Sequence, residues 1–228
     1  GKSEFLWRGL FDGVDLAFMV HTSRSFTAGL GSVGCIVKRI LYKGVAAHAG
    51  GSPWKGRNAL YAATNGLSSA NALRETFEEK DLIRFHPIIT KGGDMVNAIP
   101  ETTTIESYVR GASFEAIVKA NKRINQALCG AALSIGCNVE IQDFPGYAPN
   151  INSTDMLDVA QEAAALAIPD EVYDRTNHFN TGSTDMGDLS GIMPVVHPYM
   201  RGASGTSHGS DYRIADPEAA CVNSAKWQ

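Results

Sequence analysis

The chain has few cysteines and no long apolar run, and each of these features argues against a class of protein. Its 228 residues hold four widely spread cysteines without a C-x-x-C pair: Cys35, Cys129, Cys137 and Cys221. This spacing favours reduced thiols in a cytoplasmic protein over a disulfide framework or a cysteine-based zinc site. No stretch is long and apolar enough to cross a bilayer. The one Gly-x-Ser-x-Gly match, at residues 205–209, lies in a loop of small residues and not at a strand-to-helix elbow, which weakens a serine-hydrolase interpretation.

An excess of positive charge is absent as well. The net charge is −4, and the basic residues are scattered, so a role at nucleic acid or at an anionic membrane is not expected. Hydrophobic residues make up 44% and charged residues 19%, which are values of a folded protein rather than a disordered one. The length allows one or two domains. Because the chain starts at Gly1 and stops at Gln228 within a helix-like stretch, we expect a piece clipped at both ends.

Residues 35–144 alternate regularly between strand-like and helix-like periodicity. The predicted order is strand 35–44, helix 54–77, strand 82–90, strand 102–109, helix 113–135 and strand 139–144. Pro87 indicates an edge position or a bulge in the second strand, and Ser113 is a suitable N-cap for the second helix. The residues expected on the buried faces are Leu60, Ala63, Leu67, Ala70, Leu73 and Phe77 in the first helix, and Phe114, Ile117, Val118, Ile124, Leu128 and Ala131 in the second.

The order β-α-β-β-α-β predicts a ferredoxin-like α+β domain, in which two helices cover one face of a four-stranded antiparallel sheet. The flanking residues supply one strand near Val14–Val20, a helix near 155–167 and a short apolar run at 192–197. They are too few for a second complete domain. We therefore expect residues 35–149 to be inserted into an α/β domain of which 1–34 and 150–228 are parts.

Three histidines stand in contexts that present a side chain to a ligand. His21 follows the apolar run 15–20, and open α/β sheets build their sites at such strand ends. His208 lies in a loop rich in glycine and serine, where the backbone can approach a ligand closely. His48 has only small neighbours on both sides. Each alone also fits an ordinary structural role, as a capped, core or surface histidine.

Four further residues are candidates on weaker grounds. Asn97 lies between a Gly-Gly turn and Ile99-Pro100, where a turn-forming asparagine is also common. Arg110 ends the third predicted strand and could equally be a solvated charge. Gly205 and Thr206 belong to the small-residue loop before His208. His86 and His178 have no convergent partners in the sequence and are interpreted as structural.

In combination these segments resemble one family. Residues 47–60 (AHAGGSPWKGRNAL) resemble the first signature of the lid domain of two-metal amidohydrolases of the aminoacylase, carboxypeptidase G and carnosinase type. The stretch from Gly92-Gly93 through Asn97 to Arg110 is similar to the second lid signature. Residues 15–21 resemble the strand that ends in a metal-binding histidine. Residues 182–190, continued by 196–199, resemble the subgroup of aminobenzoyl-glutamate hydrolase and β-alanyl-lysine dipeptidase.

The resemblance implies a function for the whole protein and a role for each candidate. It implies hydrolysis of an amide bond in an N-acyl amino acid, an aminobenzoyl-glutamate-like conjugate or a dipeptide, with two divalent ions, zinc or manganese. His21 and His208 would be metal ligands and His48 would stabilise the oxyanion. Asn97, Arg110 and the Gly205-Thr206 backbone would bind substrate. The lid would form a homodimer, and the partners would otherwise be small molecules.

The family's remaining metal ligands and its Glu-Glu general base have no counterpart in this sequence. Two of roughly five ligands scarcely hold a dinuclear site, so we expect residues 1–228 alone to be inactive. The alternative is a non-catalytic dimerisation or binding module. The metal, the acyl group and the released amino acid stay open.

Overall fold

The computed structural model describes all residues from Gly1 to Gln228, and the chain divides into two compact units. The inserted unit is Gly34–Tyr147. The discontinuous unit combines Gly1–Val33 with Ala148–Gln228. No helix in either unit is both long and apolar enough to span a membrane.

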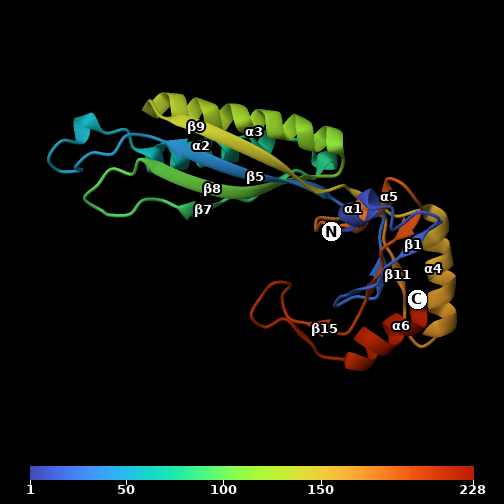
Figure 1. Ribbon diagram of the computed structural model, residues 1–228. Coiled ribbons are helices and arrows are strands. Elements are labelled where there is room, and N and C mark those ends of the chain that lie inside the picture. The colour runs from blue at the N-terminus through green and yellow to red at the C-terminus, as the bar shows by residue number, and fades with distance from the viewer. The chain divides into compact units, whose positions relative to one another are not determined.

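The inserted unit is a sheet covered on one face by two helices (Figure 1). Its elements are β5 Gly34–Lys43, α2 Ala59–Ala72, β6 Arg84–Phe85, β7 Ile88–Lys91, β8 Thr102–Gly111, α3 Phe114–Ile135 and β9 Asn138–Tyr147. All pairings are antiparallel, with β5 between β8 and β9, and with β6 and β7 along the other side of β8. This is the ferredoxin-like order that the sequence predicts.

The predicted helices form, but with shifted ends. Pro53–Lys55 is a separate 3₁₀ turn, and α2 begins at Ala59 because the Asn58 side chain accepts a hydrogen bond from the Tyr61 N–H at 3.1 Å. Ser113 caps α3 by accepting from the Ala116 N–H at 3.1 Å. Pro87 interrupts the predicted strand 82–90, which becomes the two short strands β6 and β7.

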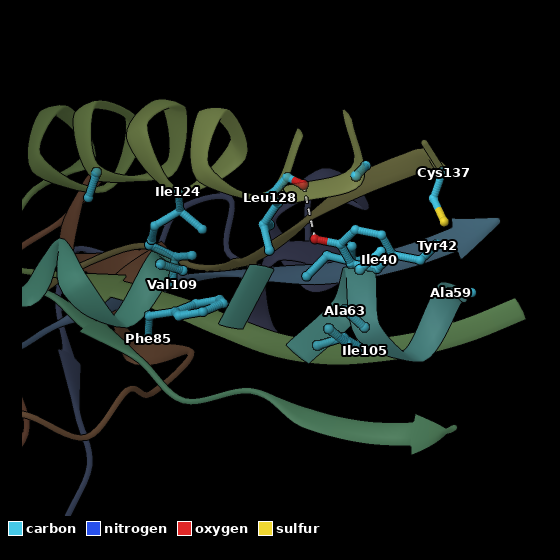
Figure 2. Packing of buried hydrophobic residues seen from close by; sticks show 14 of the residues in the cluster. Ile40, Tyr42, Ala59, Ala63, Phe85, Ile105, Val109, Ile124, Leu128 and Cys137 are labelled. Atoms are coloured by element: carbon cyan, nitrogen blue, oxygen red, sulfur yellow. Dashed lines mark hydrogen bonds between the residues drawn. The ribbon is translucent and has the colours of Figure 1, made fainter. Parts of the chain in front are cut away.

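The core of the inserted unit lies between the helices and the sheet (Figure 2). The hydroxyl of Tyr42 on β5 crosses this layer and donates to the Leu128 carbonyl on α3 at 3.0 Å. The crossing is possible because α2 carries Gly66 at that point, where a Cβ would lie 2.2 Å from the hydroxyl. Two predicted core residues of α3 are wrong: Phe114 is 59% and Val118 65% exposed, because the buried stripe is narrower than predicted and runs through the other predicted residues, among them Ile117, Ile124 and Leu128.

The discontinuous unit is built from short strands and a few helices. Its strands are β1 Ala17–Phe18, β2 His21–Thr22, β3 Thr27–Ala28, β4 Gly31–Ser32, β10 Asn150–Ile151, β11 Asp174–Arg175, β12 Phe179–Asn180, β13 Val195–Val196, β14 Tyr199–Met200, β15 Ala203–Ser204 and β16 Arg213–Ile214. Its helices are α1 Lys2–Trp7, α4 Thr154–Ala167, α5 Met186–Ser190, a π-helix Glu218–Asn223 and α6 Ser224–Trp227. The N-terminal strands β1 and β2 pair in parallel with β13 and β14 from the C-terminal part. This pairing fixes the place of His21.

Candidate functional site

His21 lies in β2, opposite Tyr199 of β14 in the parallel register. Its side chain is exposed, and its Nδ1 lies 2.7 Å from the Thr22 carbonyl oxygen. Because a carbonyl can only accept, Nδ1 carries the proton in this contact and Nε2 is left with a free lone pair. A neutral imidazole held in this way is suited to coordinate a metal ion or to accept a hydrogen bond.

His21 is part of a cluster of three aromatic rings. The ring of His197 lies 5.9 Å from that of His21 at an interplanar angle of 27°, and Tyr199 stacks on His197 at 5.2 Å and 25°. His197 is only 3% exposed, and burial lowers its pKa to about 4, so it is neutral at physiological pH. His197 is not among the predicted site residues. A signal for it is present in the sequence, since His197, like His21, directly follows an apolar strand.

His208 lies in the exposed loop between β15 and β16 and has a left-handed backbone with φ of 61°. The same loop contains Gly205 with φ of 85°, where a Cβ would lie 2.3 Å from the Asp211 carbonyl oxygen, so the turn requires glycine. The Thr206 N–H donates to Asp211 Oδ1 at 3.2 Å. Asp211 therefore shapes the loop that presents His208.

The chain contains no group of three or more histidine, cysteine, aspartate or glutamate side chains that could hold a metal ion. The structure therefore offers His21 and His208 as separate donors and does not combine them into a metal centre. Zinc sites usually take three or four protein ligands. The donor set of residues 1–228 does not by itself fit a dinuclear centre.

In the inserted unit the structure brings the loops of His48 and Asn97 together. His48 forms an isolated β-bridge with Ala98, and the Asn97 carbonyl accepts from the Ala49 N–H at 2.9 Å. The Nδ1 of His48 lies 3.2 Å from the Gly50 N and 2.9 Å from the Gly51 N, and it accepts from both N–H groups. The neutral ring therefore has its proton on Nε2. It is exposed and presents that N–H as a hydrogen-bond donor.

Arg110 belongs to a different cluster, at the end of β8. Its Nε donates to His86 Nε2 at 3.1 Å, and its guanidinium lies 5.3 Å from the centre of the Tyr108 ring. Desolvation and the charge of Arg110 together lower the pKa of His86. No partner for His86 is visible in the sequence, because the contact joins the residue after β6 to β8, and only the fold sets the register of these two strands.

This chain is similar in sequence to known peptidases and hydrolases. Residues 29–134 match the family described as a peptidase dimerisation domain. The mouse (Mus musculus) Xaa-Arg dipeptidase is 31% identical over 220 residues, which cover 94% of this chain and 50% of that protein. One of the p-aminobenzoyl-glutamate hydrolase subunits of Escherichia coli is 30% identical over 83% of this chain and 37% of its own length. The chain thus spans about half or less of the curated relatives it matches.

The fold is shared with solved structures. A Bacillus subtilis protein described as a dinuclear metal-binding peptidase from the M20 family superposes with a TM-score of 0.70. The superposition covers 98% of this chain and 58% of that one, at 20% sequence identity. At 20% sequence identity, this similarity shows a shared fold and nothing about function.

Proposed function

We propose, from the match of residues 29–134 to a peptidase dimerisation domain and from the similarity to a dipeptidase, that the whole protein is a metal-dependent amidohydrolase of the M20 peptidase family. Its substrate would be an N-acyl amino acid, an aminobenzoyl-glutamate-like conjugate or a dipeptide. The observation that carries the proposal is the alignment with a dipeptidase over 94% of the chain at 31% identity. The four cysteines are free, which agrees with the proposed cytoplasmic location.

In this proposal His21 and His208 each contribute one imidazole to a pair of zinc or manganese ions. The free Nε2 lone pair of His21 supports its role. Such ions, when bound, polarise the scissile carbonyl and supply hydroxide at neutral pH. Because two imidazoles are too few for two ions, we propose that the other ligands lie outside residues 1–228, and that these residues alone are inactive.

The inserted unit would contribute binding and transition-state stabilisation. The Nε2–H of His48 is proposed to donate to the oxyanion, because its partner Nδ1 is already held by two backbone N–H groups. Arg110 would bind a carboxylate of the substrate through its guanidinium. Asn97 would bind substrate beside His48, and the Gly205-Thr206 backbone would line the acyl or amino-acid pocket.

A second candidate is a non-catalytic dimerisation or binding module. It is favoured by the match of residues 29–134 to a dimerisation domain and by the missing third metal ligand. In either case we propose a homodimer formed through the inserted unit.

The two candidates are separated by measuring metal and hydrolysis in the whole protein. Wild type is loaded with zinc or manganese, the bound metal is quantified, and release of arginine from Xaa-Arg dipeptides and of glutamate from p-aminobenzoyl-glutamate is followed. We expect hydrolysis, with less bound metal in His21→Ala and His208→Ala but not in the control His86→Ala. Metal-independent stability without hydrolysis of any of these substrates would support the binding module. Unchanged metal in both variants would remove the two histidines from the site.

A further inference from the structure

The sheet of the inserted unit has a hollow of about 240 Å³ near its β6 and β7 side. Side chains of a strand alternate between the two faces of a sheet. Ile105 and Val109 of β8 pack in the core under the helices, so Glu106, Tyr108 and Arg110 lie on the open face. The residues that line the hollow are Val37, His86, Ile88, Glu106, Ser107 and Tyr108.

One end of the hollow is positively charged. Arg110 donates from Nε to His86 Nε2 at 3.1 Å, and its guanidinium lies 5.3 Å from the centre of the Tyr108 ring, so it contacts two lining residues. Arg84 lies directly opposite Arg110 in the register of β6 and β8. Like charges opposite each other on one face repel, and an anion bound between them would relieve this repulsion. The two arginines therefore favour a carboxylate at this end.

The other end has a single carboxylate, that of Glu106. Glu106 is exposed, and it forms no ion pair with Arg39, although Arg39 lies opposite on β5. Glu106 and Arg110 are about 13 Å apart along an extended strand. Because the Arg110 guanidinium leans over Tyr108, which lies midway between them, the span left for a ligand is roughly half of this distance.

The wall between the two charged ends is mainly apolar. Ile88 lies opposite Glu106 on β7, and Val37 lies opposite Tyr108 on β5. The Tyr108 side chain adds a ring that is 40% exposed. Apolar walls of this kind pack well against the methylene stem of a lysine or arginine, while its charged head stays at the polar end. The volume is below the roughly 300–1,000 Å³ of sites for drug-sized ligands, which suits a single side chain.

The ligand that matches this wall has a carboxylate, an aliphatic stem and a cation in that order. An acidic side chain would place a second negative charge beside Glu106, and an uncharged one would gain no ion pair there. We infer that the hollow binds the basic side chain of an amino acid whose carboxylate Arg110 holds, and that Glu106 determines this specificity. The inference rests on the proposed function and names its substrate class, amides and dipeptides that release a basic amino acid.

N-acetylarginine and N-acetylcitrulline are the probes, because they have nearly the same shape and differ in charge at the end of the side chain. Each is titrated into residues 1–228 without metal and followed by backbone NMR. We expect saturable shifts at Glu106, Tyr108 and Arg110 with an affinity on the order of millimolar, because so small a ligand supplies little binding energy. N-acetylarginine should bind about three- to fivefold more tightly, the usual effect of an exposed ion pair. N-acetylglutamate should bind more weakly than both.

Glu106→Gln should remove the preference for N-acetylarginine, whereas Arg110→Gln should weaken both probes. The matched control is Glu140→Gln, on the same face of the sheet but on the β9 edge, and it should keep the preference. Well-dispersed spectra of the variants verify folding. Absence of saturable shifts, equal affinities of the two probes in wild type, tighter binding of N-acetylglutamate, or a preference that survives in Glu106→Gln would each overturn the inference.

The whole protein provides a second readout. Glu106→Gln should lower the ratio of kcat/KM for alanyl-arginine to that for alanyl-citrulline about three- to fivefold, and an unchanged ratio would also overturn the inference. A whole protein that hydrolyses neither dipeptide would contradict the proposed hydrolysis, while the titration still decides whether the hollow prefers a basic side chain.

Discussion

His48 is oriented by its own loop, since the N–H groups of Gly50 and Gly51 both point at Nδ1. The ring is exposed, and its neighbours along the chain are alanine and glycine. Its removal should therefore affect a bound substrate far more than the fold. The same two hydrogen bonds fix the tautomer that an oxyanion donor needs.

We expect His48→Ala in the whole protein to lower turnover by about 10²–10³-fold, the usual loss for one oxyanion donor. Bound metal and melting temperature should stay close to those of wild type. His48→Gln keeps an N–H donor and should recover part of the rate. Steady-state kinetics, metal analysis and calorimetry test this, and full turnover in the alanine variant would refute the catalytic role.

His86 provides a pH-dependent readout of the Arg110 cluster. Desolvation, and next the charge of Arg110, hold the pKa of His86 below 6.5. The folded state then binds fewer protons than the unfolded state just below pH 6.5, so the contribution of His86 to stability is complete above pH 6.5 and declines as the pH falls below it.

An NMR titration of the His86 ring should therefore give a midpoint below 6.5. Arg110→Gln should raise that midpoint without restoring it fully, because the desolvation stays. A midpoint at or above 6.5 in wild type would mean that the hydrogen bond from Arg110 to His86 does not form in solution.

At the scale of the elements, helix α2 packs closely against Tyr42 because its residue 66 is a glycine. Gly66 lies against the Tyr42 hydroxyl, and a Cβ there would also come within 3.2 Å of a Leu128 methyl group. In contrast, Gly130 of α3 is exposed with nothing within 4 Å of an added Cβ. The two helical glycines thus form a matched pair of substitution sites.

Gly66→Ala should destabilise the inserted unit by about 1–3 kcal/mol, because overpacking displaces Tyr42 from its bond to the Leu128 carbonyl. Gly130→Ala should stabilise it by about 0.5–1 kcal/mol through the higher helix propensity of alanine. Urea unfolding of the two variants measures both values. A stabilising Gly66→Ala would show that α2 can move away from the sheet at little cost.

The element order of the inserted unit could be predicted from the sequence because each element carries its own periodicity and caps. Helix α3 shows the limit: Ile117, Ile124 and Leu128 are buried as predicted, but Phe114 and Val118 are not. Apolar periodicity identifies the apolar face of a helix. It does not predict how much of that face the sheet covers. The edges of the stripe are therefore the residues most easily misplaced.

The candidate site was predictable only in its separate parts. The run before His21 indicates a strand end, and the small neighbours of His48 indicate an accessible ring. The contact of His21 with His197 depends on the pairing of β2 with β14, which no local pattern encodes. The same holds for the bridge between His48 and Ala98, since it joins two loops through space.

At the scale of the whole molecule, the sheet of the inserted unit has one edge suited to a second copy. The edge strand β7 pairs only with β8, and all four of its residues are exposed, with Ile88 at 62%. The opposite edge, β9, carries Glu140, Gln142 and Asp143, charged and polar residues that protect an edge from pairing. We therefore propose that β7 contributes to the homodimer.

Ile88→Lys should shift the protein from dimer to monomer, because a lysine on an edge strand opposes pairing with another strand. The fold should tolerate it, since Glu106 lies opposite on β8. The control Gln142→Lys, on the β9 edge, should stay dimeric. Size-exclusion chromatography with light scattering distinguishes these outcomes, and an unchanged dimer in Ile88→Lys would exclude this edge from the interface.

The pairing of β1 and β2 with β13 and β14 also sets an order of events on the ribosome. His21 and Tyr199 are separated by about 180 residues, and at roughly 5–20 residues per second their pairing waits about 10–40 s of synthesis. The inserted unit has its last strand by Tyr147 and can fold during that interval. The apolar segment from Ala17 to Val20 meanwhile has no partner strand, so it is exposed to non-native contacts until β13 and β14 have been synthesised.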